Sequence, residues 1–279
     1  MRIVVLGATG YLGSEIFVQL KKNYIASALY GTSTTKRENF IQLDVIDKEN
    51  IESVVSHTQP NVVIWPLMSR NDERKLIHTG LNNVLSYMNR DTLFIYLSTD
   101  GLFSNGSGNY TEEDQASYLD VRNPMSHYTN AKIDGEQIIR RIHNNHLILR
   151  SGPIYGKNTQ GQLDHRVAYV LNEISNGNKI ERATNIFKTF VHVKDLAIAI
   201  TKLMMMEHRG TLHVGPEHKE SYYSFFQTLI NQQDDLIIPY EISEEEAEER
   251  AISHSLNTTI CNSLLPHVFR KVDSEWLNE

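Results

Sequence analysis

Tyr128 and Lys132 are the side chains of this sequence best suited to transferring a proton. Their i, i+4 spacing places both on one face of a helix, although such pairs also arise by chance as surface contacts. The lysine ammonium favours the phenolate and so lowers the pKa of the phenol from its ordinary value of about 10. Thr99 follows an apolar run, and its hydroxyl could hold a substrate oxygen near Tyr128. These three residues are the expected catalytic groups for reducing a ketone.

A glycine-rich turn near residue 7 predicts a dinucleotide site. It comes directly after the first apolar run and opens a helical pattern. Glycines let the backbone turn tightly and approach a pyrophosphate, whose charge meets free amides and the positive end of the helix. We expect the cofactor to contact Gly7, Thr9, Gly10, Tyr11, Leu12 and Gly13.

The segment after the second expected strand bears on the choice between NADP and NAD. It has no acidic residue to accept from ribose hydroxyls. Hydroxyl residues at 32–35 instead precede Lys36 and Arg37, which suit a 2′-phosphate. NADP(H) is therefore favoured and NAD(H) is the alternative, while a purely solvated role for both cations stays open. Asp44 either meets the adenine region or caps its own loop.

Four further polar residues are candidates for binding a substrate. Ser98 and Asp100 flank the threonine at the end of the fifth expected strand. Arg150 ends the sixth strand, and Tyr155 lies in the Gly/Asn-rich loop after it. Both would face the substrate at the carboxyl ends of the strands, although Arg150 serves equally to pin the loop.

Alternating strand-like and helix-like stretches predict the scaffold that positions these residues. Apolar runs bounded by turn formers predict six strands, at residues 2–6, 26–30, 40–43, 61–65, 93–98 and 146–150. Longer stretches between them predict helices at 11–22, 48–57, 71–88 and 125–143. The pattern indicates an α/β fold with a doubly wound parallel sheet of the Rossmann type.

The alternation loosens after residue 150, which indicates a smaller mixed α/β lobe at the carboxyl-terminal end. We expect residues 1–152 and 186–207 to form the dinucleotide-binding Rossmann domain. Residues 153–185 and 208–279 would then form the substrate-binding lobe.

Composition and charge narrow the classes of partner. The chain has 279 residues, of which 40% are hydrophobic and 22% charged, as in ordinary globular enzymes. Its formal charge of -7 argues against nucleic acid, and no apolar run is long enough to span a membrane. The single cysteine fits a reducing compartment, and the 12 histidines show no metal-ligand spacing. We therefore expect a cytoplasmic protein that binds neither metal, membrane nor nucleic acid.

Taken together, the motifs resemble those of the extended short-chain dehydrogenases/reductases, the NAD-dependent epimerase/dehydratase superfamily, and within it the dTDP-4-dehydrorhamnose reductase branch. The matching segments are the turn at 7–13, Ser98-Thr99-Asp100 with Phe103, Gly108 to Asp114, Pro124, Tyr128-x-x-x-Lys132 with Gly135-Glu136, Arg150 to Gly156, and Phe190 to Ala197. The resemblance implies a triad of Thr99, Tyr128 and Lys132, in which Lys132 also binds the nicotinamide ribose. It further implies a sugar-nucleotide pocket between domain and lobe, and family members commonly form homodimers.

This resemblance implies an NADP(H)-dependent reductase of a nucleotide-activated 4-keto-6-deoxysugar, of the kind used in polysaccharide biosynthesis. One alternative is a sugar-nucleotide epimerase or dehydratase that retains NAD. Another is a non-catalytic, dinucleotide-binding regulatory subunit, since that of methionine adenosyltransferase resembles this branch too. The sequence departs from the branch at residues 65–68, where small residues are usual, at Gly101, where an aromatic is common, and around Ile77, where an Asn is usual. These departures bear mainly on the substrate.

Overall fold

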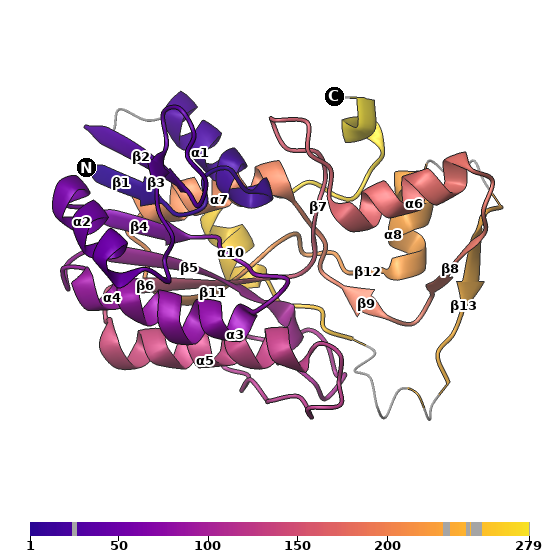
Figure 1. The fold of residues 1–279 in the computed structure, drawn as a ribbon. Coiled ribbons are helices and arrows are strands. Elements are labelled where there is room, and N and C mark those ends of the chain that lie inside the picture. The colour runs from indigo at the N-terminus through magenta and orange to yellow at the C-terminus, as the bar shows by residue number, and fades with distance from the viewer. Residues whose placement is uncertain (24–26, 231–234, 244–245, 247–252, 279) are drawn as a thin grey trace.

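A parallel sheet of seven strands forms the centre of the molecule (Figure 1). This computed structural model describes the chain apart from residues 24–26, 231–234, 244–245, 247–252 and 279. The strands lie in the order β11-β6-β5-β4-β1-β2-β3, and every neighbouring pair is parallel. Their bounds are β1 (Arg2–Val5), β2 (Ala28–Ser33), β3 (Ile41–Gln42), β4 (Val62–Trp65), β5 (Leu93–Thr99), β6 (His146–Ser151) and β11 (Gly210–Val214). The expected doubly wound α/β fold is confirmed.

Helices cover both faces of this sheet because its central strands are apolar on both sides. Every residue of β4 and β5 is buried, as in other sheets covered on both faces. One apolar cluster packs α1 and α7 on one face, and a second packs α2, α4 and α5 on the other (Figure 1). The bounds are α1 (Tyr11–Asn23), α2 (Lys48–Thr58), α3 (Glu73–Lys75), α4 (Asn82–Tyr87), α5 (Ser126–Ile142), α7 (Val193–Met205) and α10 (Thr259–Leu264).

The structure differs from the sequence prediction at three elements. The second strand is shifted toward the site, over Ala28–Ser33 instead of 26–30, and residue 26 lies outside the described residues. The helix expected over 71–88 is α3, a π-helical turn (Leu76–Leu81) and α4 in succession. The seventh strand, β11, was not expected, and it comes from the segment 208–279 that was assigned to the lobe.

A smaller lobe, drawn on the right of Figure 1, packs around its own apolar core. The rings of Phe190 and Phe225 stack at its centre, with their centroids 3.8 Å apart. Its elements are α6 (His165–Ser175), β8 (Ile180–Ala183), β9 (Phe187–Lys188), β12 (Glu220–Ser221), α8 (Tyr222–Leu229) and β13 (Ile237–Tyr240). β7 (Ile154–Tyr155) and β10 (Val191–His192) pair with each other where the lobe meets the sheet, and Ile154 and Val191 pack in the core of the sheet. The expected mixed α/β lobe is therefore present beside the sheet.

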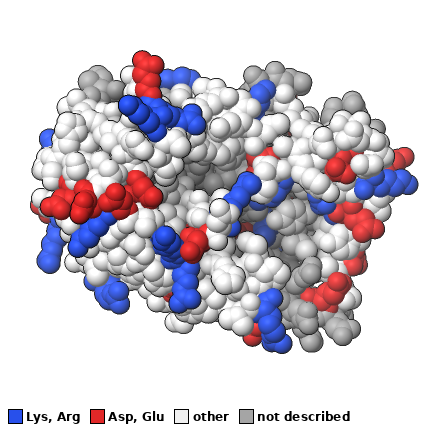
Figure 2. All heavy atoms as spheres, in the orientation of Figure 1, with Lys and Arg blue, Asp and Glu red and all other residues white. Residues whose placement is uncertain are grey.

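The surface carries charges of both signs. On the face drawn in Figure 2, basic and acidic side chains lie interspersed among uncharged ones. In the described part of the chain, no helix combines the length and the apolar character needed to cross a bilayer.

Candidate functional site

The glycine-rich turn lies between β1 and α1, at the carboxyl edge of the sheet. Gly7 has a φ of +62°, a conformation that favours glycine, and its carbonyl accepts from the Gly10 amide at 2.9 Å. A Cβ on Gly13 would lie only 2.2 Å from the Gly7 carbonyl oxygen. The start of α1 therefore packs directly on the turn, which only glycine at position 13 permits.

The amides of this turn fit a dinucleotide pyrophosphate. Two of them are already used, because the Gly7 amide donates to Thr32 Oγ1 at 3.1 Å and the Ala8 amide donates to the Thr32 carbonyl at 2.8 Å. Within the described residues, the amides of Leu12 and Gly13 in the first turn of α1 have no acceptor. These free donors and the positive end of the helix suit an anion.

The side chains of Thr9 and Tyr11, two other expected cofactor contacts of the turn, both have hydrogen-bond partners within the protein. Thr9 Oγ1 lies 3.3 Å from Ser33 Oγ at the end of β2. Tyr11 is turned toward the lobe, where its hydroxyl donates to the Gly156 carbonyl at 2.8 Å. The Tyr11 side chain therefore ties α1 to the loop after β7, and a contact of its backbone amide with a cofactor stays a prediction.

Lys36 and Arg37 lie just beyond β2, the strand that follows the glycine-rich turn. Both are exposed, and neither forms an ion pair with a residue that the structure describes. Asp44 accepts from the Ile46 amide at 2.9 Å, so its carboxylate caps its own turn. A contact of Asp44 with adenine stays a prediction.

The three expected catalytic residues lie together at the end of β5. Thr99 is the last residue of β5, and a side-chain hydrogen bond joins it to Tyr128 in the first turn of α5. Lys132 lies one turn further along α5, with Nζ 5.8 Å from the centre of the Tyr128 ring. The i, i+4 spacing thus brings the ammonium beside the phenol as expected.

Lys132 is held by contacts that the sequence did not reveal. Its Nζ donates to the carbonyls of Leu67 and Leu97, each at 3.2 Å. It also forms an ion pair with Glu73 Oε1 at 3.0 Å. The lysine and glutamate side chains are 3% and 2% exposed, so this is a buried pair of charges. No local motif marks Glu73, because α3 and α5 meet only in the folded chain.

The pKa of Tyr128 corrects one expectation. Burial raises this pKa above its ordinary value, and the negative charge of Glu73 raises it further, whereas the hydrogen bond from Thr99 lowers it. The expected net lowering by Lys132 is not found, because the carboxylate of Glu73 lies against that ammonium and opposes its effect. Tyr128 is therefore held as a neutral phenol.

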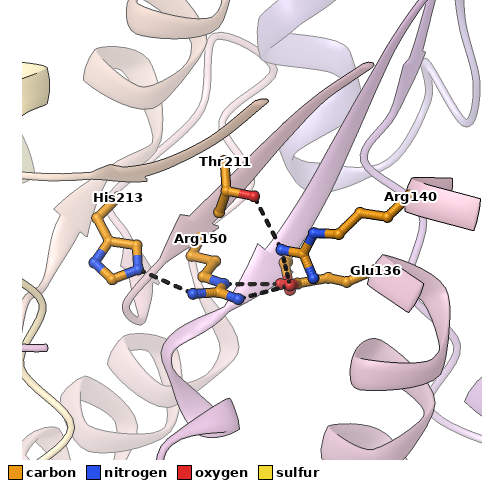
Figure 3. A network of polar contacts seen from close by, with 6 residues as sticks. Glu136, Arg140, Arg150, Thr211 and His213 are labelled. Carbon is orange, nitrogen blue, oxygen red and sulfur yellow. Dashed lines mark hydrogen bonds and ion pairs between the residues drawn. The ribbon is translucent and has the colours of Figure 1, made fainter. Parts of the chain in front are cut away.

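Ser98 and Arg150 belong to a network around the buried Glu136, and Figure 3 labels Arg150 and Glu136 of this network. The guanidinium of Arg150 binds both carboxylate oxygens of Glu136, at 3.0 and 2.8 Å. Ser98 donates to the same carboxylate at 2.6 Å, and Arg140 binds it from the next turn of α5 at 2.8 Å. The structure thus uses Ser98 and Arg150 to join α5 to β5 and β6, and does not direct them at Tyr128.

Asp100 and Tyr155 contact the lobe. Asp100 Oδ2 forms an ion pair with Lys188 Nζ of β9 at 3.0 Å, and its Oδ1 lies 3.4 Å from Thr99 Oγ1. The Tyr155 ring is buried in the core of the lobe, packed edge-on against Phe225. Asp100 therefore lies beside the catalytic group, whereas the Tyr155 ring is a packing residue.

A cavity of about 280 Å³ opens in the lobe between α6, β8, α8 and β13. Two cations, Arg166 and Arg182, contribute to its lining, and the Arg182 guanidinium lies 4.9 Å above the centre of the Phe226 ring. The positive charge of Arg166 also lowers the pKa of Tyr128 and of Tyr11. Sequence reasoning missed both arginines, since neither belongs to a recognisable motif.

A comparison with models of protein families establishes the class of protein to which this fold and this site belong. The model of the NAD dependent epimerase/dehydratase family matches residues 3–215, so the chain belongs to this family. The family resemblance expected from the motifs is confirmed.

Particular relatives share the fold at low sequence identity. A hypothetical dTDP-4-dehydrorhamnose reductase from Sulfolobus tokodaii superposes with a TM-score of 0.79 and 20% identity, covering 99% of this chain and 98% of that one. The dTDP-4-dehydrorhamnose reductase of Bacillus anthracis in complex with NADP gives a TM-score of 0.76 and 22% identity, covering 98% and 95%. Methionine adenosyltransferase 2 subunit beta of Rattus norvegicus is 23% identical over an alignment of 228 positions that covers 76% of this chain. The chain spans only 66% of that relative's length.

Proposed function

We propose that this protein is an NADP(H)-dependent reductase of a nucleotide-activated 4-keto-6-deoxysugar. The observation that carries the proposal is the meeting of Thr99, Tyr128 and Lys132 at the sheet edge that also holds the glycine-rich turn. Ligands of doubly wound sheets bind at this edge, so a cofactor on the turn and a ketone beside Tyr128 would be neighbours.

The three side chains have separate tasks in this reaction. The Thr99 hydroxyl holds the substrate carbonyl oxygen close to Tyr128 Oη. The bound dinucleotide supplies the hydride. As the carbonyl carbon gains that hydride, its oxygen takes the proton of the phenol, which leaves an alcohol and a phenolate. The ammonium of Lys132 stabilises the phenolate as it forms.

The raised pKa of Tyr128 supports reduction over the alternative that retains NAD. A reductase needs a neutral phenol at the start of its cycle, since the phenol is the proton donor. An epimerase that begins by oxidising an alcohol needs the opposite form, a phenolate that accepts a proton. Burial and Glu73 both favour the neutral form here.

Basic side chains at two places support the choice of NADP(H) as the cofactor and of a nucleotide sugar as the substrate. Lys36 and Arg37 are exposed beside the end of β2 and available to a 2′-phosphate, which favours NADP(H) over NAD(H). Arg182 lines the cavity in the lobe together with Tyr222 and Phe226, so a nucleotide diphosphate would find a cation beside aromatic rings there, while Arg166 of the same lining is paired with Asp164.

Substitution of Tyr128 by Phe tests the assignment directly. We expect Y128F to reduce kcat by about 100-fold or more with a panel of nucleotide 4-keto-6-deoxysugars, because only the proton is removed. NADPH affinity should stay within about threefold, since the ring is retained. The measurements are absorbance of NADPH during turnover and fluorescence titration of the cofactor.

Tyr118, which is half exposed and hydrogen-bonded to Asp134, provides the matched control. Y118F should keep wild-type turnover. Unchanged kcat in Y128F would remove the proton-donor role and with it this mechanism.

The similarity to a methionine adenosyltransferase subunit favours one other candidate, a regulatory subunit that binds a dinucleotide without turning it over. NADPH binding with no oxidation on any sugar would support this role. The decisive measurement is co-purification with a partner enzyme at fixed stoichiometry, together with regulation of that enzyme that persists in Y128F. NADPH oxidation by a keto sugar would exclude a purely regulatory role.

A further inference from the structure

Glu73 lies against Lys132, at a position that belongs to none of the recognised sequence motifs. Its Oε1 is 3.0 Å from Lys132 Nζ, and both side chains are almost fully buried. Its Oε2 accepts from the Ser69 amide at 2.5 Å. The carboxylate is thus fixed by the loop that follows β4 and faces the ammonium of α5.

The remaining neighbours of the ammonium cannot offset its charge fully. Two are neutral carbonyls, those of Leu67 and Leu97. Two are phenol rings, with centres 5.0 Å away for Tyr96 and 5.8 Å away for Tyr128. In the described part of the chain, Glu73 is the only acidic residue paired with Lys132. A buried ammonium without a counter-charge favours its neutral form, and removing one partner of a buried pair leaves such a charge.

The loop after β4 joins this pair to the cofactor turn. Leu67, whose carbonyl binds Lys132, packs its side chain so closely on Gly7 that a Cβ there would lie 2.4 Å from a Leu67 methyl group. Asp72 caps the start of α3 by accepting from the Lys75 amide at 2.8 Å, and so fixes the helix that carries Glu73. The segment after β4 therefore holds both Lys132, through the Leu67 carbonyl, and the carboxylate that faces it.

We propose that Glu73 is a positioning residue, which keeps Lys132 charged and held beside Tyr128 through the buried ion pair. The inference rests on the proposed function only in assigning that ammonium to the reduction. Glu73 also opposes ionisation of Tyr128, because its negative charge raises the pKa of the phenol. The titratable groups facing the ammonium are Glu73 from α3, Tyr96 from β5 and Tyr128 from α5.

The test follows the charge of Lys132 itself by NMR. The protein is labelled with ¹³C at lysine Cε, the Lys132 resonance is assigned with K132M, and its shift is followed against pH. In E73Q we expect the titration midpoint to fall by at least about one pH unit relative to wild type, because the side chain keeps its shape and loses its charge. E73D, which restores the charge on a shorter arm, should recover most of that shift.

Controls and outcomes separate this inference from the proposed function. E49Q, which neutralises an exposed carboxylate in the first turn of α2, should leave the Lys132 midpoint unchanged. An equal midpoint in wild type, E73Q and E73D would overturn the role of Glu73. If E73Q does not fold, E73D decides, because its shorter arm lengthens and weakens the ion pair: a Lys132 midpoint below that of wild type supports the pair, and a midpoint equal to that of wild type overturns it.

Activity gives a separate reading. With the keto-sugar substrate, the decrease of kcat at alkaline pH should begin at a lower pH in E73Q than in wild type, by a similar amount. This shift is expected whether Lys132 or Tyr128 is the group that loses its proton earlier. Absence of turnover in wild type would refute the proposed function, yet the NMR titration would still decide the role of Glu73.

Discussion

The acidity of Tyr128 is set by burial and by residues that are far apart along the chain. Burial and the carboxylate of Glu73 raise its pKa, and the hydrogen bond of Thr99 lowers it. Of these, the sequence could indicate Thr99, since it ends an apolar run next to a motif. It could not indicate Glu73, because a buried ion pair depends on which helices meet and not on spacing along the chain.

At the same scale, we propose that the choice of dinucleotide depends on Lys36 and Arg37. We expect the double variant K36A/R37A to weaken NADPH binding by about tenfold or more, since charge-assisted contacts contribute roughly 1.5–3 kcal/mol each. NADH affinity should change less than about twofold, because NADH has no 2′-phosphate to lose. Fluorescence titration with both cofactors measures the two affinities.

K21A/K22A removes an equally exposed pair of cations at the end of α1 and serves as the control. It should leave both affinities as they are. Equal losses of affinity for NADPH and NADH in K36A/R37A would mean that the two cations do not contact the 2′-phosphate.

At the scale of elements, α5 has two roles on successive turns. Its first turns carry Tyr128 and Lys132, and the next carries Glu136, which binds Ser98 of β5 and Arg150 of β6 (Figure 3). Arg140 extends this network to Thr211 of β11 at 2.9 Å. The network thus locks the catalytic helix onto three neighbouring strands.

Substitution of Glu136 by Gln tests how much this network contributes to the stability of the protein. Breaking a buried ion pair by removing one partner costs about 3–5 kcal/mol, and we expect E136Q to lose unfolding free energy of this size at pH 7. Burial opposes ionisation of Glu136, but Arg150, Ser98 and Arg140 bring its pKa below the ordinary 4.5. A carboxyl whose pKa is lowered on folding contributes stability above 4.5, and this is lost as pH falls through the folded value.

The difference in stability between wild type and E136Q should therefore shrink below pH 4.5. Guanidinium unfolding at a series of pH values measures it. E52Q, on the exposed side of α2, should stay within about 0.5 kcal/mol of wild type. A difference that does not change down to pH 3 would contradict the electrostatic origin of the effect.

Apolar runs made most of these elements predictable. Strands such as β4 and β5 are continuous blocks of buried residues with turn formers on both sides, so their type and place were confirmed. β11 was missed because Gly-Thr-Leu-His-Val has little apolar signal, and its burial comes from α10 and β6. The π-helical turn was missed because Gly80 approaches Val45 in a way that local spacing does not indicate.

At the scale of the whole molecule, hydrogen bonds and an ion pair between described residues join the sheet to the lobe, and three of them are close to the glycine-rich turn or to Thr99. Asp100 pairs with Lys188, the Tyr11 hydroxyl donates to the Gly156 carbonyl, and the fully buried Glu15 accepts from the Thr159 amide at 2.7 Å. All three lie beside the proposed cofactor and substrate sites. The orientation of the lobe is therefore fixed next to the catalytic group.

A double-mutant cycle on Asp100 and Lys188 measures one of these contacts. We expect D100N and K188Q each to destabilise the protein, and the coupling free energy between them to be about 1–3 kcal/mol, because the two side chains are largely buried. The four proteins of the cycle are compared by guanidinium unfolding. K202Q, at an exposed position of α7, should change stability by less than about 0.5 kcal/mol. If the losses of stability in D100N and K188Q simply add up in the double variant, the ion pair does not stabilise the contact between sheet and lobe.

The place of β11 in the sheet has a consequence during synthesis. β6 ends at Ser151, but its outer neighbour begins only at Gly210, after most of the lobe has been made. At ribosomal rates of about 5–20 residues per second, the hydrogen-bonding edge of β6 stays open for roughly 3–12 s. An open edge of apolar residues is a template for pairing with other chains. Nascent chains of this protein should therefore need protection in that interval, which ends when the seventh strand closes the sheet.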